Sequence, residues 1–126
     1  MPRRKPTALD DLDELVAAIT VDAYGDDEAQ SAFLEVFNQE VRSPTAATVL
    51  GIAVELIVFD YQDERRGIVA RCRRDGVSQD LAVVDLAFRP DAVAARVQAA
   101  YRRWLGLPPH PFDMPAGWRP SWLEDT

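Results

Sequence analysis

The residues most able to do chemistry form an acidic cluster of four carboxylates within seven positions. Its members are Asp22, Asp26, Asp27 and Glu28, and Gly25 among them lets the backbone turn tightly. Calcium binds six to eight oxygens, mainly from flexible carboxylates and carbonyls, so the cluster predicts a site for a hard cation. The EF-hand pattern is absent. Capping and the helix dipole also explain acids at a helix start, without a metal, and both interpretations stay open.

The sequence contains none of the common catalytic motifs: no glycine-rich phosphate loop, no His-Glu-x-x-His pair and no Gly-x-Ser-x-Gly elbow. The single histidine, His110, lies in a proline-rich segment, where a histidine is more often a bystander than a base. The single cysteine, Cys72, occupies an inward position of a predicted strand and should fill the core. Arg71 and Arg73 beside it would lower its pKa only if the thiol were exposed. We therefore expect a non-enzymatic protein.

Composition and charge narrow the class of protein further. The chain has 126 residues, 48% of them hydrophobic and 28% charged, as in one ordinary folded domain. We expect a cytoplasmic protein, because the apolar runs are too short for a membrane, no signal segment is recognisable, and one cysteine cannot form an internal disulfide.

The charge is unevenly distributed along the chain. The net charge of -7 divides into -9 for residues 1–63, with 13 acids and 4 bases, and +2 for residues 64–126, with 8 acids and 10 bases. Residues 7–41 hold ten carboxylates and no Lys or Arg, so this half should repel nucleic acid and attract cations.

Two helices are predicted in the first third of the chain. Apolar residues recur at spacings of three and four from Leu9 to Ile19, which indicates an amphipathic helix. Asp27 and Gln30 resemble a capping box that opens a second helix, which Ser43-Pro44 ends. The second helix is expected to bury Ala29, Phe33, Val36, Phe37 and Val41.

Strands and one more helix are predicted after residue 44. Short β-branched runs between turn signals indicate strands near residues 46–50, 54–61, 66–73 and 79–88, with a tight turn at Asp75-Gly76. A last helix is expected from Pro90-Asp91, with Val93, Val97, Ala100, Tyr101 and Trp104 on its buried side. The order predicts an α+β domain: two N-terminal helices, a small SH3-like antiparallel β-barrel of four to five strands, and a C-terminal helix.

We divide the chain into a flexible tail at residues 1–8, one domain at 9–107 and a Pro/Trp-rich tail at 108–126. In the last segment Trp118 and Trp122 flank Pro120. Such rings either pack back on their own domain or dock on a partner.

Five segments together resemble the CcbP-like family of small bacterial calcium-binding proteins. They are Ile19-Thr-Val-Asp-Ala-Tyr-Gly-Asp-Asp-Glu28, Ser43-Pro44 with Ala46 or Ala47 beyond it, Val54-Glu-Leu-Ile-Val58, Leu81-Ala-Val-Val-Asp-Leu86 and Tyr101-Arg-Arg-Trp-Leu105. The resemblance covers roughly residues 9–107 with the same order and spacing. It implies an SH3-like barrel joined to helices, and a protein that buffers or senses calcium through clustered surface carboxylates.

Position by position, the resemblance places calcium ligands within the acidic cluster. The family is also acidic near the end of the second helix, where this chain has Asn38-Gln39-Glu40, so Asn38 and Glu40 complete the implied ligand set. Two amides and one carboxylate carry less charge than a run of acids, which should lower the affinity for calcium to the micromolar to millimolar range. The arginines of the third strand and its turns are a second departure from the family.

Two other functions stay open. The main alternative is a protein-interaction module whose tail docks on a partner protein or on a second copy in a homodimer. Binding of nucleic acid on a strand face is disfavoured by the acidic net charge, and the arginines would more simply pair with the acidic helices. That face would use Arg65, Arg66, Arg71, Arg73 and Arg74 with Phe59 and Tyr61.

Overall fold

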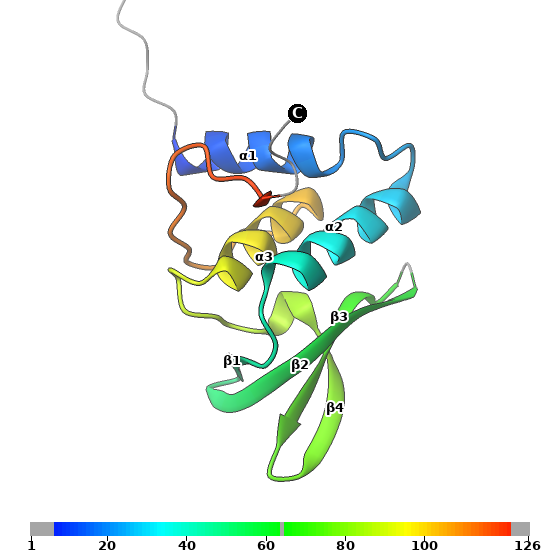
Figure 1. Cartoon of the computed structure of the whole chain (residues 1–126), viewed down its shortest axis with the longest axis vertical. Coiled ribbons are helices and arrows are strands. Elements are labelled where there is room, and N and C mark those ends of the chain that lie inside the picture. Colours follow the sequence, from blue (N-terminus) through cyan, green and yellow to red (C-terminus); the bar gives the residue numbers. More distant parts are fainter. Residues whose placement is uncertain (1–6, 64, 122–126) are drawn as a thin grey trace, which may run out of the picture.

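Three helices lie on one side of a four-stranded antiparallel sheet in the computed structural model, which describes residues 7–63 and 65–121 (Figure 1). The elements are α1 (Ala8–Ile19), α2 (Asp26–Glu40), β1 (Thr45–Val49), β2 (Ile52–Asp63), β3 (Gly67–Arg74), β4 (Val77–Ala82), the short 3-10 helix η1 (Val83–Asp85) and α3 (Val93–Trp104). The predicted α+β class and helix order are confirmed. No helix of the described residues is long and apolar enough to cross a membrane.

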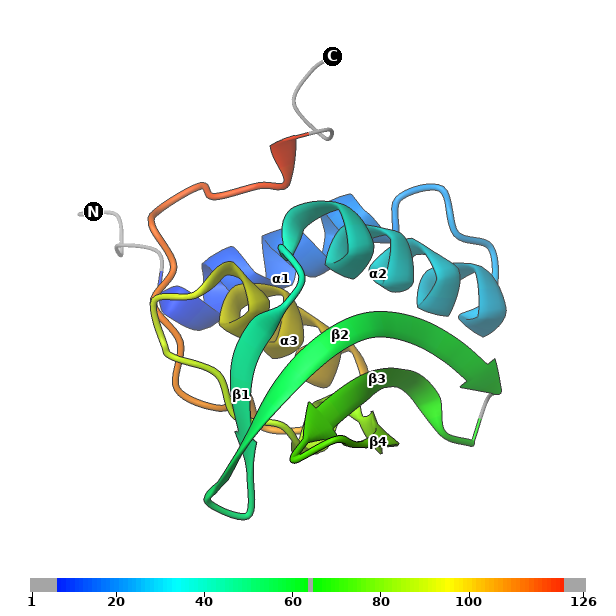
Figure 2. The ribbon, with the colours of Figure 1, turned by 60° about the horizontal axis from the view of Figure 1, so that its bottom comes forward.

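The helices form two layers above the sheet. α2 packs against β2 and β3, while α1 packs on α3 and α2 and lies farthest from the strands (Figures 1 and 2). The core therefore lies between α2, α3 and the sheet, and continues upward beneath α1. Its largest buried apolar side chains include Leu12, Leu15, Phe33, Phe37 and Tyr101.

α1 begins with a capping box that the sequence reading did not identify. The Thr7 hydroxyl accepts a hydrogen bond from the Asp10 amide at 3.1 Å, and the Asp10 carboxylate accepts one from the Thr7 amide at 2.9 Å. Thr7 and Ala8, assigned to a flexible tail, thus belong to the start of the helix. Residues 1–6 of that predicted tail lie outside the described residues.

The capping box predicted for α2 is wrong. The N-cap is Gly25, two residues before Asp27, and it makes no side-chain capping bond; the helix begins at Asp26. Gln30 instead turns inward and is only 5% exposed, because the hydroxyl of Tyr101 offers it a buried hydrogen-bond partner. The predicted burial of Ala29, Phe33, Val36 and Phe37 is confirmed.

The predicted SH3-like barrel is an open sheet with strand order β1-β2-β3-β4. The predicted last strand, 79–88, ends at Ala82, because the chain turns into η1 before it reaches β1. Only Ala87 then returns to β1, where it exchanges two hydrogen bonds of 2.8 and 2.9 Å with Thr48. One bridged pair is too little to close the sheet into a barrel.

The β3–β4 hairpin follows its predicted chemistry. Asp75 and Gly76 both have positive φ, at 51° and 79°, as a two-residue hairpin turn requires. β3 buries Ile68, Ala70 and Cys72 against the core, and the inward position predicted for Cys72 is confirmed. Val69, between Ile68 and Ala70, is buried as well.

The described part of the C-terminal tail packs back on the domain. Phe112, Met114 and Trp118 are partly buried against the core, and the guanidinium of Arg96 lies 5.7 Å from the centre of the Trp118 ring. The Arg96 side chain also donates a 2.8 Å hydrogen bond to the Asp113 carbonyl. Trp122, the other tryptophan of the predicted docking segment, lies outside the described residues.

Candidate functional site

The loop that joins α1 to α2 and the first turn of α2 carry four of the six predicted cation ligands, Asp22 in the loop and Asp26, Asp27 and Glu28 in the helix. An open pocket of about 410 Å³ lies between the end of α1, this loop and the first turns of α2. Asp22, Asp27 and Glu28 line this loop pocket, and Glu35 brings a fourth carboxylate to it. Asp26, at the first position of α2, is not among the lining residues.

Three of these carboxylates already accept hydrogen bonds, and one of the three, Glu35, accepts its bond from Gln39 Nε2 at 3.2 Å. The Tyr61 hydroxyl, at the far end of β2, donates to Asp27 Oδ1 at 2.9 Å. The Tyr24 amide donates to Glu28 Oε2 at 3.2 Å. Each carboxylate has a second oxygen and several lone pairs, so these contacts orient the groups without exhausting their capacity as ligands.

The predicted ligands at the end of α2 do not join the loop pocket. Asn38 and Glu40 lie on the last turn of a helix of fifteen residues, about 20 Å along its axis from Asp26. The Glu40 carboxylate accepts hydrogen bonds from the amide and the hydroxyl of Ser121, at 2.8 and 3.2 Å. Glu40 thus anchors the tail in this structure, and the six predicted ligands divide between two ends of one helix.

The carboxylates around the loop pocket are spread rather than converged. Across residues 7–63 and 65–121, no group of three or more His, Cys, Asp or Glu side chains is placed so that it could hold a metal ion. Calcium ligands lie about 2.3–2.6 Å from the ion, so the loop and the side chains would have to close around a cation.

Sequence reasoning missed Glu35 and Tyr61 as neighbours of the site. Glu28, Ser31, Ala32 and Glu35 all line the pocket, and their spacing of three, four and seven places them on one face of α2. That spacing is a signal that could have found Glu35. Tyr61 lies 34 residues from Asp27 in the sequence, so no local pattern indicates its contact.

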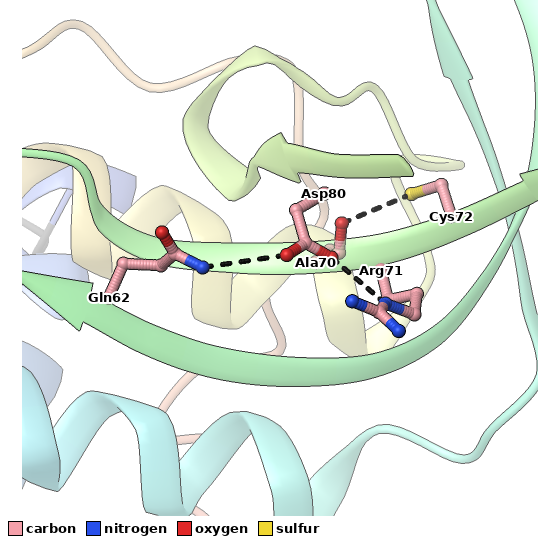
Figure 3. A network of polar contacts seen from close by, with 5 residues as sticks. All are labelled: Gln62, Ala70, Arg71, Cys72 and Asp80. Carbon is pink, nitrogen blue, oxygen red and sulfur yellow. Dashed lines mark hydrogen bonds and ion pairs between the residues drawn. The ribbon is translucent and has the colours of Figure 1, made fainter. Parts of the chain in front are cut away.

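Arg71 and Arg73 pair within the sheet, so for these two arginines the predicted pairing with the acidic helices is wrong. Arg71 Nε lies 3.0 Å from Asp80 Oδ1, and Asp80 also accepts a bond from Gln62 at 3.4 Å (Figure 3). Arg73 pairs with Glu55 on the neighbouring strand. An exposed charge on a strand is most simply paired with an opposite charge on the neighbouring strand. Because Arg71 and Arg73 each have such an acid beside them, this face of the sheet carries both signs of charge.

The aromatic residues considered for base stacking do not lie open on this face. Phe59 is buried and stacks on Phe37, with ring centres 4.7 Å apart. Tyr61 reaches Asp27 on α2. The arrangement lacks the pairing of exposed aromatics with basic residues that single-stranded nucleic acids use.

Two acids of α1, Asp13 and Glu14, pair with arginines of α3 and of the tail. Arg103 Nε donates to Asp13 Oδ1 at 2.7 Å, and the Arg119 guanidinium lies 3.4 Å from Glu14. The hydrogen bond from Arg103 holds the pKa of the Asp13 carboxyl below its ordinary value, with desolvation opposing it. These pairs tie α1 to elements that follow the sheet.

The side chains of Cys72 and His110 both lie against backbone carbonyls of the domain. Burial raises the pKa of the Cys72 thiol, and the nearby Asp80 charge adds to this, so the thiol stays protonated at neutral pH. Its sulfur lies 3.7 Å from the Ala70 carbonyl (Figure 3). His110 Nε2 lies 3.2 Å from the Val84 carbonyl, which holds the imidazole against the chain after β4.

Comparison of the chain with family models, curated proteins and solved structures finds no match. The resemblance to CcbP-like calcium-binding proteins therefore rests on the five sequence segments alone.

Proposed function

We propose that this protein is a non-enzymatic calcium-binding protein that buffers or senses the ion through the loop pocket between α1 and α2. The observation that carries the proposal is that Asp22, Asp27, Glu28 and Glu35 all line one open pocket, which no Lys or Arg of the described part of the chain lines. Carboxylates gathered without a counter-charge repel one another, and a divalent cation relieves that repulsion.

Binding would couple to the order of the loop. To reach calcium distances, the free oxygens of Asp27 and Glu28 must turn toward Asp22 while their other oxygens keep or share the contacts with Tyr61 and the Tyr24 amide. This rearrangement costs free energy, so we expect weak binding, in the micromolar to millimolar range. An ion that binds only the folded chain stabilises it, by about 1.4 kcal/mol at ten times its dissociation constant.

Calorimetric titration and thermal melts with calcium, magnesium or a chelator test the proposal. We expect heat on calcium addition and a rise in melting temperature of several degrees, with magnesium less effective because it needs a tighter octahedral site. The double variant Asp27→Asn/Glu28→Gln should lose both effects. Glu40→Gln is the matched control, because Glu40 lies at the other end of α2 and binds Ser121. No heat and no melting shift at millimolar calcium would refute the proposal.

The second candidate function is a protein-interaction module. Docking through the C-terminal tail has little support, because the described tail packs on its own domain. A different observation favours the module: two large apolar side chains of the α1–α2 loop are exposed, Val21 at 70% and Tyr24 at 90%.

A further inference from the structure

The floor of the loop pocket is apolar, a property that calcium binding does not need. Its apolar lining comes from both helices and the loop between them: Ala18, Ile19, Val21, Ala23 and Ala32. Val21 and Tyr24 project from the same loop into solvent. Small side chains on the helices leave room for an inserted aliphatic group, and the exposed pair would cover it.

The rim of the pocket carries one sign of charge. Asp22, Asp27, Glu28 and Glu35, all exposed, line the pocket together with its apolar side chains, and within residues 7–63 and 65–121 no Lys or Arg lines it. The whole segment 7–41 also lacks Lys and Arg, so no base from α1, the loop or α2 offsets this field. An apolar floor within an acidic rim complements a ligand that joins aliphatic side chains to positive charges.

A second copy of this chain is a poor occupant. The net charge of -7 makes two copies repel. Several arginines that a copy could offer are already paired on its own surface, Arg71 with Asp80, Arg73 with Glu55 and Arg103 with Asp13. A different, basic protein is therefore the better source of a complementary surface.

We propose that the loop pocket docks a basic amphipathic helical segment of a partner protein. Its aliphatic side chains enter between the end of α1 and α2, and its Lys or Arg side chains meet the carboxylates of the rim. The segment and calcium then compete, because both use Asp27 and Glu28. This competition rests on the proposed calcium function, whereas the docking itself does not.

The test uses two fluorescent synthetic peptides of equal charge. One places Leu and Lys in a helical period, and the other replaces every Leu by Ser. Fluorescence anisotropy at moderate salt without calcium should show the Leu/Lys peptide binding at least about tenfold more tightly, because only it fills the apolar floor. Equal affinity for both peptides would mean unspecific attraction to an acidic surface and would overturn the proposal, as would no binding of either.

Paired variants locate the binding surface. The double variant Val21→Ser/Tyr24→Ser should lower the affinity for the Leu/Lys peptide about tenfold. Leu50→Asn is the matched control, because Leu50 is 96% exposed in a turn at the tip of the β1–β2 hairpin. Glu35→Gln should lower the affinity for both peptides. Its control, Asp75→Asn on the β3–β4 turn, should leave both affinities unchanged. An equal loss in a variant and its control would place the peptide elsewhere.

The remaining arms separate the competing explanations. Saturating calcium should release the peptide, and peptide binding that calcium leaves unchanged would refute competition while leaving docking in place. Loss of calcium heat without loss of peptide binding would refute only the proposed function. Self-association in sedimentation at low salt would reassign the pocket to a second copy. A chain without residues 1–6 that binds the peptide about tenfold more tightly would reassign it to the chain's own N-terminal bases.

Discussion

The hydroxyl of Tyr101 donates a 2.6 Å hydrogen bond to the side-chain oxygen of Gln30, which joins α3 to α2 inside the core. The same hydroxyl accepts a 3.1 Å bond from the Ile68 amide of β3. Burial raises the pKa of Tyr101, so the phenol keeps its proton and serves as the donor. The Tyr101 side chain thus connects α2 and α3 to β3 of the sheet. α2 is also the helix whose first turns line the loop pocket.

Tyr101→Phe should destabilise the fold by about 1–3 kcal/mol, because it leaves the buried Gln30 oxygen and the Ile68 amide without their partner. Urea denaturation measures the change in the free energy of unfolding. Tyr24→Phe removes the same hydroxyl from a side chain that is 90% exposed, and it should change stability little. Similar losses in both variants would contradict the role assigned to this hydrogen bond.

Gly67→Ala should also destabilise the fold, for two separable reasons. Gly67 has a φ of 65°, which L side chains rarely adopt, and an added Cβ would clash with the Tyr101 hydroxyl oxygen. Gly76→Ala carries a similar backbone cost at a φ of 79° but meets nothing within 4 Å. In urea melts we expect Gly67→Ala to lose more stability than Gly76→Ala, and part of that excess to disappear when Tyr101→Phe is combined with it. Equal losses would show that the contact with Tyr101 costs nothing.

The Asp13–Arg103 pair should stabilise α1 in a pH-dependent way. Because the pKa of Asp13 is lower in the folded than in the unfolded chain, its stabilisation is present above the unfolded pKa. It is lost as the pH falls through the folded pKa. The free energy of unfolding of Asp13→Asn should therefore differ from that of the unaltered chain near neutral pH and converge with it in acid. Added salt should shrink the difference at neutral pH, because both side chains are largely exposed. A difference that ignored pH and salt would indicate packing rather than charge.

Removal of residues 108–126 should lower stability without changing the association state, because Phe112, Met114 and Trp118 pack on the core. Trp118→Ala alone should cost about 2 kcal/mol, since the ring is only partly buried and loses the contact with Arg96. Ala116→Ser, an exposed position of the same segment, is the control. Denaturation measures the stability and sedimentation measures the association state. Altered association with unchanged stability would favour docking of the tail on another chain.

Local patterns in the sequence were enough for much of the fold. The burial of Phe33, Val36 and Phe37 follows from helical spacing, and the inward position of Cys72 follows from its place in a strand. The helical and strand periods are properties of the backbone, so they need no knowledge of the partner element. The same holds for the hairpin turn at Asp75-Gly76, where local backbone angles decide the structure.

The predictions that were wrong failed because the residues concerned have partners far away in the sequence. Gln30 fits a helix cap by its local position, but a phenol 71 residues away along the chain draws it into the core. The barrel fails to close because η1 follows β4 and leaves only Ala87 to reach Thr48. Arg71 and Arg73 meet acids on neighbouring strands, and this pairing depends on register.

The candidate site divides in the same way. The sequence by itself determined that Asp22, Asp27 and Glu28 would lie together, because they are within seven residues around one helix start. Only the tertiary structure decided that Glu40 binds the tail, that Tyr61 donates to Asp27, and that the carboxylates line one pocket together with apolar side chains. The physical reason is that chain connectivity fixes neighbours over a few residues, whereas contacts between distant segments depend on how whole helices and strands pack.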